Sequence, residues 1–438
     1  QIKSSGMNIE FQYGKEILVL RVPNDSQVYT SSYETEDTDP AGLVLSSVSN
    51  PVGCLPLSDQ LRQRREGNIV VVVSDMTRPI PYYSFLPALL HDIVSNGINR
   101  SEVLILVATG MHRPSTPEEK MLMFGKEIVE NYRIIDHDAE NEEELAMLEG
   151  KSWSGSNVKL NRHYTEAGFR ILTGLVEPHF MAGFSGGRKA VCPGLAALDT
   201  IRMFHGYEFL SHPNASNAVL AGNPCHLENT SVARLCPADF SVNIILDRSK
   251  KINKVISGEQ FVSHEKAVEY VKNRSCRIVP APVGLAVTSC GGYPLDTTFY
   301  QCVKGMVNVL PALEENGEMI IFGSCTEGIG SPEYAELVKR YSSGTDEFLH
   351  AISQGLFIKD QWQFQMHIRV LEKIGLENLH FYTGSIPQEE LALLSVTPHS
   401  VEKDHLANLV QRQIDQAVAS GKKIAVFPEG PYCSPMIS

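Results

Sequence analysis

Two uninterrupted apolar runs near the start of the chain limit the folds that it can adopt. They read IVVVVS at residues 69–74 and VLILVA at residues 103–108. Continuous β-branched runs of this length are typical of strands that helices bury on both faces, as in parallel sheets. The helices and further strands predicted around them are residues 83–96, 117–132, 133–136 and 171–175. This alternation predicts an α/β protein with mostly parallel sheets.

A second α/β unit is predicted to begin near residue 280. The segment RIVPAPVG contains two prolines and is interpreted as a linker. The elements predicted beyond it are a strand at 285–290, a helix at 297–310, and strands at 319–323 and 424–427. We therefore expect an N-terminal cofactor-binding domain over residues 7–275, completed by residues 413–438, and a C-terminal domain over residues 280–412. The active site is expected in the cleft between them, where pockets are frequent.

The composition narrows the possible partners and the cellular location. The 438 residues are 43% hydrophobic and 20% charged, which is ample for globular cores. A net charge of −13 argues against nucleic acid as the main partner, because clustered Lys and Arg bind phosphate backbones. No apolar run approaches the ~20 residues that a membrane span needs. With no signal-peptide pattern and nine scattered cysteines, we expect a cytoplasmic protein with reduced thiols.

Three polar clusters each follow a predicted buried strand. They read DMTRP from residue 75, TGMHRP from residue 109 and EPHFMAGFSGGRK from residue 177. Ligands of open α/β sheets bind beyond the carboxyl ends of the strands. The sequence therefore predicts that the three clusters converge on one site.

The first two clusters carry candidate binding and proton-transfer groups. Asp75 and Arg78 lie in a turn that two prolines stiffen, so they can present a hydroxyl-binding carboxylate and an anion-binding guanidinium. The alternative is a local Asp–Arg pair that closes the turn. His112 is placed for proton transfer near neutral pH, or else it is an ordinary loop histidine.

The third cluster contains a glycine-rich loop, GFSGGRKA at residues 183–190. It lacks the Gly-Lys-Ser/Thr of a phosphate loop, and no complete dinucleotide fingerprint is present. Lys189 follows the glycines and precedes VCPG, so we expect it to be partly desolvated. Burial lowers the pKa of a lysine and makes its amine nucleophilic. The alternative is an ordinary phosphate-binding lysine.

Three residues further along the chain have more ambiguous patterns. His205 lies in a predicted helix that starts near residue 199, and it is either a metal ligand or an ordinary core or surface histidine. Gln301 and Lys304 are one helical turn apart, so they share a face. An amide and an ammonium there can hold a carboxylate, unless this is an exposed helix face.

Taken together, these motifs resemble those of the lactate racemase family of nickel-pincer enzymes. The matching patterns are DxTRP, TGxHRP, EPHFxxGxSGGRKAVxPG, a histidine sixteen residues after the lysine, and YQxxK. The resemblance covers nearly the whole chain from Met7. Met76 departs from the polar residues common in the family at that position. The resemblance therefore does not imply what the neighbouring pocket binds.

The resemblance implies a covalently bound cofactor. This is the nickel-pincer nucleotide, a pyridinium-3-thioamide-5-thiocarboxylic acid mononucleotide that is attached to Lys189 and holds nickel, with His205 as the protein ligand of the metal. The further cofactor contacts that the resemblance implies are Asp75, Thr77, Arg78, Ser185, Gly187 and Arg188. It also implies, as partners, the enzymes that synthesise the cofactor.

The resemblance further implies an isomerase that interconverts D- and L-2-hydroxy acids. Hydrogen leaves C2 as hydride, a 2-keto acid forms, and hydrogen returns to its other face; His112 and His179 serve as acid and base. The residues implied to bind the substrate are Arg78, Tyr300, Gln301 and Lys304. Lactate is the default substrate. The alternatives are a racemase or epimerase of a larger hydroxy acid, such as malate or a sugar acid, and a cofactor-binding protein without turnover.

Overall fold

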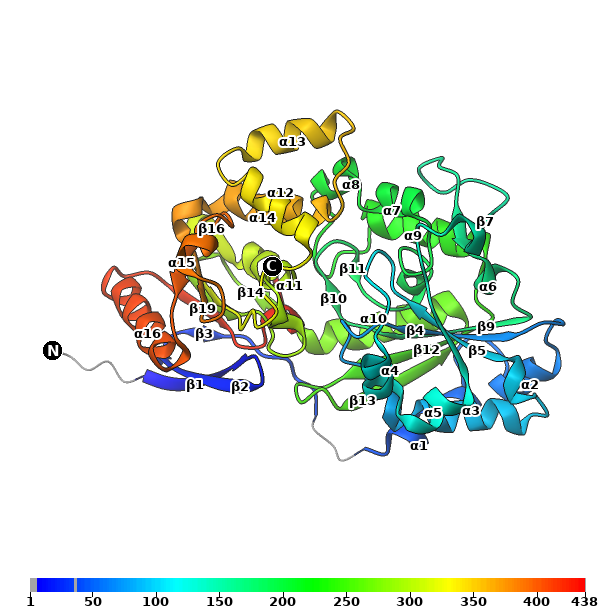
Figure 1. Cartoon of the computed structure of the whole chain (residues 1–438). Helices are drawn as coiled ribbons and strands as arrows, with labels where there is room; N and C mark the ends of the chain where they lie inside the picture. Colours follow the sequence, from blue (N-terminus) through cyan, green and yellow to red (C-terminus); the bar gives the residue numbers. More distant parts are fainter. Residues whose placement is uncertain (1–5, 35–37, 438) are drawn as a thin grey trace. The chain divides into compact units, whose positions relative to one another are not determined.

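The computed structural model describes residues 6–34 and 38–437, and the chain divides into two α/β units (Figure 1). Unit 1 is discontinuous and comprises residues 1–32 and 274–438. Unit 2 comprises residues 33–273. The expected absence of a signal peptide concerns the N-terminus, whose first five residues lie outside the described residues.

Unit 2 is built on a six-stranded sheet in the order β13-β12-β9-β4-β5-β6. All neighbours are parallel except β13, which is antiparallel to β12. The strands are β4 (Ile69–Ser74), β5 (Val103–Ala108), β6 (Arg133–Asp136), β9 (Phe169–Leu175), β12 (Phe240–Leu246) and β13 (Ile252–Gly258). The predicted strands at 69–74, 103–108 and 133–136 are confirmed, and the strand predicted at 171–175 starts two residues earlier.

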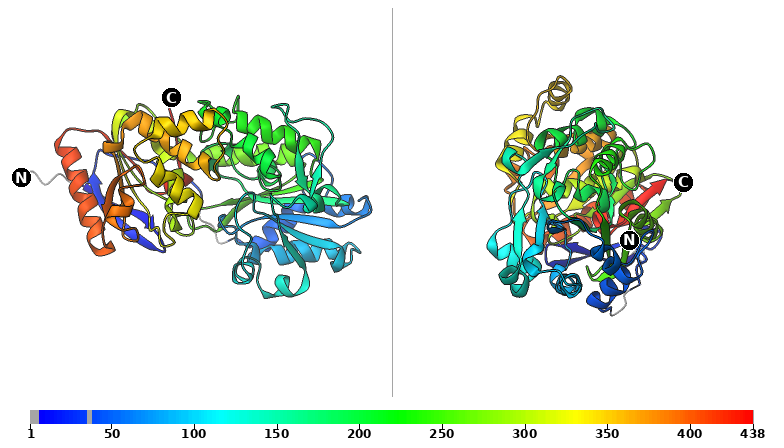
Figure 2. Two further views of the ribbon diagram at one scale, coloured as in Figure 1. Left: turned by 45° about the horizontal axis from the view of Figure 1, so that its top comes forward. Right: turned by 90° about the vertical axis from the view of Figure 1, so that its right-hand side faces the viewer.

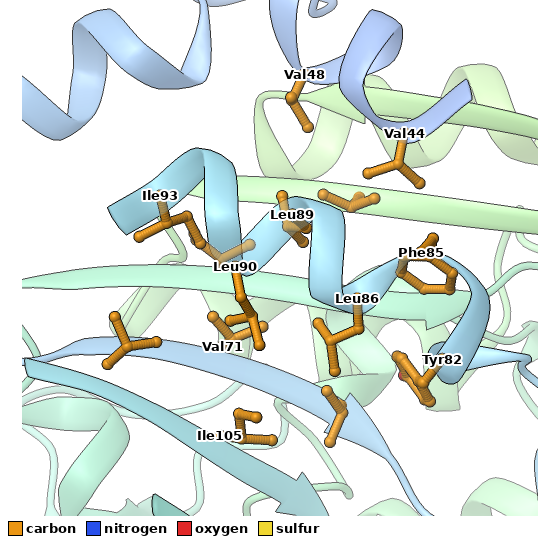
Figure 3. Packing of buried hydrophobic residues seen from close by; sticks show 14 of the residues in the cluster. Val44, Val48, Val71, Tyr82, Phe85, Leu86, Leu89, Leu90, Ile93 and Ile105 are labelled. Carbon is orange, nitrogen blue, oxygen red and sulfur yellow. The ribbon is translucent and has the colours of Figure 1, made fainter. Parts of the chain in front are cut away.

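The core of unit 2 lies where helices cover this sheet. Side chains of α3 (Leu86–Ser95) repeat at helical spacing, and Leu86 and Leu90 point towards Val71 of β4 and Ile105 of β5 (Figure 3). Each such side chain contributes roughly 1.5–3 kcal/mol by leaving water. The other helices of the unit are α1 (Pro40–Ser49), α2 (Leu57–Arg62), α4 (Pro117–Phe124), α5 (Lys126–Asn131), α6 (Arg162–Thr165), α7 (Leu198–Phe204), α8 (Tyr207–Ser211), α9 (Pro224–Leu235) and α10 (Gln260–Ser275).

Short elements complete unit 2. Two small antiparallel hairpins pair β7 (Leu145–Met147) with β8 (Lys159–Asn161), and β10 (Pro178–His179) with β11 (Gly183–Phe184). The 3-10 turn η4 spans Gly187–Ala190. The helix predicted over residues 117–132 is instead two helices, because Gly125 between them takes a φ of +81° that ends α4.

Unit 1 contains a second six-stranded sheet, in the order β18-β17-β16-β15-β19-β3, and every neighbouring pair is parallel. Its strands are β3 (Gln27–Val28), β15 (Val283–Ser289), β16 (Leu313–Phe322), β17 (Leu379–Thr383), β18 (Thr397–Ser400) and β19 (Ile424–Phe427). Two smaller sheets pair β1 (Gly6–Tyr13) with β2 (Glu16–Pro23), and β14 (Cys276–Val279) with β20 (Ser434–Ile437).

Helix α16 (Lys403–Ala419) and the β1–β2 hairpin enclose one core of unit 1 (Figure 2). Leu406, Val410 and Ile414 of the helix are fully buried there, and the ring of Phe11 meets that of Phe322 edge-on at 5.2 Å. The other helices are α11 (Phe299–Val309), α12 (Pro332–Arg340), α13 (Thr345–Ser353), α14 (Gln361–Ile374) and α15 (Gln388–Leu391). Helix α11 agrees with the helix predicted at residues 297–310.

The predicted domain boundaries need correction. Residues 413–438 do not complete the N-terminal domain, because β19 pairs with β15 and β20 pairs with β14, all in unit 1. The N-terminal strands β1, β2 and β3 also belong to unit 1. The segment interpreted as a linker is the strand β14 followed by the start of β15. An apolar run shows that a strand exists, but not which of two parallel sheets it joins.

Two further observations concern the chain as a whole. All nine cysteines carry free thiols. Among the helices of residues 6–34 and 38–437, none combines the length and the apolar character that crossing a bilayer requires.

Candidate active site

The three polar clusters meet at the carboxyl ends of the neighbouring strands β9, β4 and β5. Asp75 follows β4, His112 follows β5, and their side chains touch, with His112 Nδ1 2.5 Å from Asp75 Oδ2. Arg78 Nη1 lies 2.9 Å from Glu177 Oε1, in the turn after β9. The predicted convergence of the clusters is confirmed. Arg78 pairs across the sheet edge with Glu177 and not within its own turn.

The carboxylate of Asp75 determines which ring nitrogen of His112 carries the proton when the ring is neutral. Asp75 is 8% exposed, and its Oδ1 accepts hydrogen bonds from the backbone N–H of Thr77 at 3.2 Å and from its hydroxyl at 2.6 Å. Burial raises the pKa of Asp75, but the contact with His112 and these hydrogen bonds lower the pKa by more, so the net shift is downward. A charged carboxylate can only accept, so in the neutral ring of His112 the proton is on Nδ1 and the lone pair is on Nε2.

His179 has the opposite arrangement. It lies in β10, is 6% exposed, and its Nδ1 is 3.2 Å from the backbone nitrogens of both Met181 and Ala182. Backbone N–H groups can only donate, so Nδ1 holds the lone pair and the proton of the neutral ring is on Nε2. The two histidines therefore present different nitrogen chemistry: a lone pair on His112 and an N–H on His179.

The glycine loop runs close to β9. A Cβ on Gly186 would lie 2.9 Å from the carbonyl oxygen of Leu175, and φ of Gly186 is +76°. The hydroxyl of Ser185 donates to that same carbonyl at 2.6 Å, and Ser185 is 2% exposed. The hydroxyl thus holds the loop against β9, and a contact of Ser185 with the cofactor stays a prediction.

The side chain of Arg188 points into the helical layer. It is 3% exposed, donates from Nη1 to the Thr230 hydroxyl at 2.8 Å, and stacks its guanidinium on the Phe261 ring at 5.2 Å. Burial lowers the pKa of Arg188 to about 10. Nε and Nη2 have no hydrogen-bond partner among the described residues. These contacts with α9 and α10 give Arg188 a place in the packing of the loop.

Lys189 has the desolvated amine that the sequence predicts. Burial, followed by the charge of Arg78, lowers its pKa to about 7. Its Nζ lies 5.4 Å from the centre of the Phe204 ring, and part of the side chain remains accessible. A substantial fraction of this amine is therefore uncharged at neutral pH, which is its nucleophilic form.

His205 comes directly after α7, at its C-cap. Burial, followed by the charges of Lys189 and His112, lowers its pKa well below the ordinary value. The imidazole is therefore neutral, which is the form that binds metals. Within the described part of the chain, no cluster of three or more His, Cys, Asp or Glu side chains has the arrangement of a metal site.

The remaining predicted residues lie in unit 1, on α11. The hydroxyl of Tyr300 accepts a hydrogen bond from Trp362 Nε1 at 3.0 Å. Gln301 is 9% exposed, and its Oε1 has no hydrogen-bond partner among the described residues. Lys304 follows one turn later on the same helix. Their meeting with the unit 2 residues in one site stays a prediction.

Sequence reasoning missed two residues of this site. Glu177 was part of a motif, but nothing in its pattern identified it as the partner of Arg78. His264 on α10 lies in no motif, yet its Nε2 donates to the carbonyl oxygen of Ser185 at 2.9 Å. Both contacts depend on how distant elements pack.

Comparison with known proteins agrees with this geometry. Residues 13–218 match the lactate racemase N-terminal domain, and residues 278–430 match the lactate racemase C-terminal domain. A lactate racemase of Thermoanaerobacterium thermosaccharolyticum is 34% identical over 430 residues, which cover 97% of this chain and 98% of that protein. A lactate racemase of Lactiplantibacillus plantarum is 35% identical over 397 residues, which cover 88% of this chain and 89% of that protein.

These matches define an isomerase of the racemase or epimerase class. The chain belongs to the lactate racemase family.

Solved structures confirm the predicted α/β class with two mostly parallel sheets. The lactate racemase apoprotein from T. thermosaccharolyticum has a TM-score of 0.86 and 32% identity, and the match covers 98% of this chain and 100% of that one. A protein from Thermotoga maritima has a TM-score of 0.67 and 17% identity, with 92% and 100% covered. The second likeness concerns the fold alone.

Proposed function

We propose that this enzyme interconverts the D and L forms of a 2-hydroxy acid, with lactate as the default substrate, through a 2-keto acid. The observation that carries the proposal is the buried amine of Lys189, with a pKa lowered to about 7. Its charge and that of His112 both lower the pKa of His205, and His112 is bound to Asp75. Family membership supports the same reaction class.

The residues fit the nickel-pincer nucleotide that the family implies. An uncharged amine at Lys189 is the form that a thioamide linkage requires, and a neutral imidazole at His205 is the form that ligates nickel. When bound next to Lys189 and His205, this group would supply an acceptor and donor of hydride for C2 of the substrate. Asp75 binds His112 and Thr77, so we propose that it positions His112 in addition to its predicted contact with the cofactor.

The chain's own side chains supply the proton chemistry. His112, held by Asp75, offers Nε2 as the base for the substrate hydroxyl proton. His179 offers Nε2–H, because its Nδ1 is held by two backbone amides. The Arg78 guanidinium uses Nη1 for Glu177, and its other donors are assigned to the substrate carboxylate.

We assign Tyr300, Gln301 and Lys304 to the same carboxylate. Gln301 has a buried side-chain oxygen without a protein partner in the described part of the chain. Such an acceptor is costly unless a ligand satisfies it. The hydroxyl of a 2-hydroxy acid can donate to this oxygen, and the amide NH₂ of Gln301 can donate to the carboxylate.

A chiral assay tests the proposal. Protein produced together with the cofactor-synthesising enzymes is loaded with nickel and given enantiopure lactate, malate and larger 2-hydroxy acids. We expect one class to racemise, and C2-deuterated substrate to keep its label because hydrogen is returned directly. Loss of the label to water would contradict hydride transfer. If only malate or a sugar acid racemised, that compound would be assigned as the substrate instead of lactate. If no compound were turned over, a cofactor-binding protein without turnover would be favoured.

Cofactor attachment is tested separately. Intact mass and peptide mapping should place the adduct on Lys189, and His205→Ala should lose nickel. Active enzyme with an unmodified Lys189 would refute the assignment.

We also propose that the protein is cytoplasmic, because its free thiols would stay reduced there.

A further inference from the structure

Helix α10 contacts the loop that carries Lys189 at three successive places. The Phe261 ring lies under the Arg188 guanidinium at 5.2 Å. His264, one turn later, donates from Nε2 to the Ser185 carbonyl at 2.9 Å. Glu265 Oε1 lies 4.0 Å from Arg188 Nη2. Only the His264 contact is a hydrogen bond to the loop's own backbone.

The ring of His264 also fills the space beside Gly187. A Cβ on Gly187 would lie 2.6 Å from His264 Cδ2 and 2.7 Å from its Cγ. Gly187 has a φ of +51°, which favours glycine. The loop is thus enclosed between β9 on one side, through Ser185 and Gly186, and His264 on the other.

His264 is suited to hold this loop at all working pH values. It is 2% exposed. Burial, followed by the charge of Arg188, lowers its pKa to about 3, so the ring is neutral. Its Nδ1 has no hydrogen-bond partner among the described residues. A neutral ring with one proton must carry that proton on Nε2 to donate to a carbonyl.

Two further bonds transmit this position to Lys189. The backbone N–H of Lys189 donates to the Gly186 carbonyl at 3.1 Å, and the N–H of Gly194 donates to the Lys189 carbonyl at 3.2 Å. A shift of the Ser185–Gly187 backbone would therefore move the start of the Lys189 side chain. We propose that His264 is a positioning residue that holds the Ser185–Gly187 backbone and thereby keeps the amine of Lys189 in its buried place.

The inference rests on the proposed role of Lys189, but its test needs neither cofactor nor substrate. The apo chain is treated over a range of pH with an amine-acylating reagent, and the modification of Lys189 is followed by peptide mass. In the native chain the reaction should titrate with a pKa of about 7. In His264→Leu the freed amine should titrate nearer its ordinary 10.5, and acylation at neutral pH should fall roughly tenfold or more.

Two variants separate the hydrogen bond from general packing. His264→Gln keeps an N–H near the Nε2 position and should restore most of the native titration. His137→Leu is the matched control, since His137 is also 2% exposed and bonds through Nε2 to a backbone carbonyl, that of Ala196, at 2.9 Å. It should leave the titration of Lys189 near pH 7. An unchanged Lys189 in folded His264→Leu, or equal shifts in His264→Leu and His264→Gln, would overturn the inference.

A measurement on the native chain covers the case in which His264→Leu does not fold. Nuclear magnetic resonance should show His264 protonated on Nε2, with a through-hydrogen-bond coupling to the carbonyl carbon of Ser185. A proton on Nδ1 instead would overturn the inference. A failed racemase assay would not, because these readouts concern only the unliganded loop.

Discussion

Asp75 determines which ring nitrogen of His112 carries the proton. The negative charge of the Asp75 side chain should therefore matter more for the racemisation rate than its shape. Asp75→Asn keeps the shape and removes the charge that accepts Nδ1–H. We expect the racemisation rate at equal nickel content to fall roughly 10²–10⁴-fold. Thr77→Val, which removes one hydrogen bond to the same carboxylate, should cost less than about tenfold. Near-normal turnover in Asp75→Asn would refute the assignment of His112 as the base.

The two histidines should also differ before any substrate binds. Long-range ¹⁵N–¹H spectra of the apo chain report which ring nitrogen is protonated. We expect the proton on Nδ1 in His112 and on Nε2 in His179, because the first faces a carboxylate and the second faces two amides. The same tautomer in both residues would contradict the division of roles.

Lys189 should make the stability of the apo chain depend on pH. Its pKa is about 7 in the folded chain, against an ordinary value of 10.5. Between these values the unfolded chain binds more protons, so the free energy of unfolding should rise with pH, by at most about 1.4 kcal/mol per pH unit. Urea unfolding of the native chain and of Lys189→Met across this range measures the difference. Parallel curves would show that the folded amine is not desolvated.

Much of the candidate site could be predicted from single residues because each lies in a polar run after a buried strand. The residues singled out in this way are Asp75, Arg78, His112, His179 and Lys189, while His205 follows a helix and its role came from the resemblance alone. Their partners could not be predicted, since Glu177 meets Arg78 only because β9 and β4 are neighbours. Ser185 and Arg188 were assigned to the cofactor, yet the contacts that the structure gives them are with the β9 backbone and with α9 and α10.

At the scale of elements, the strands buried on both faces were the most predictable parts, because an apolar run leaves few alternatives. The ends of helices and the breaks between them were harder to predict. The two helices at 117–124 and 126–131 read as one pattern, and only the backbone at Gly125 separates them. The strand β14 was interpreted as a linker because of the prolines that follow it. In both cases the residue pattern did not show where the element ends.

The glycine loop should tolerate substitution poorly at Gly186. Gly186→Ala adds a Cβ that would meet Leu175 and Val176 at 2.9 Å, at a φ of +76°. Gly97→Ala is the matched control, with a φ of +84° and no atom within 4 Å. Backbone strain alone should cost Gly97→Ala about 1 kcal/mol, and the added overlap should cost Gly186→Ala about 3 kcal/mol or more. Urea unfolding measures both, and equal losses would mean that the loop can move away from β9.

At the scale of the whole molecule, the chain leaves one unit and returns to it. Both sheets consist mostly of parallel strands, so the run at 424–427 predicts a strand without indicating which of the two sheets it joins. The structure places β19 between β15 and β3, inside the sheet of unit 1. The domain prediction failed here because long-range pairing leaves no local trace in the sequence.

This topology makes a prediction about fragments of the chain. Residues 33–273 form a continuous unit that contains its own sheet and core, so this fragment should fold alone and unfold cooperatively. It contains Lys189, whose amine should still titrate near pH 7.

A fragment of residues 7–275 carries the N-terminal strands without their partners β15 and β19. Hydrogen exchange should therefore show that residues 7–32 are unfolded in this fragment. Deleting residues 413–438 from the full chain should unfold unit 1, because it removes β19 from between its neighbours, and leave unit 2 folded. If the deletion instead unfolded residues 33–273 and spared unit 1, the C-terminal segment would belong to the other sheet.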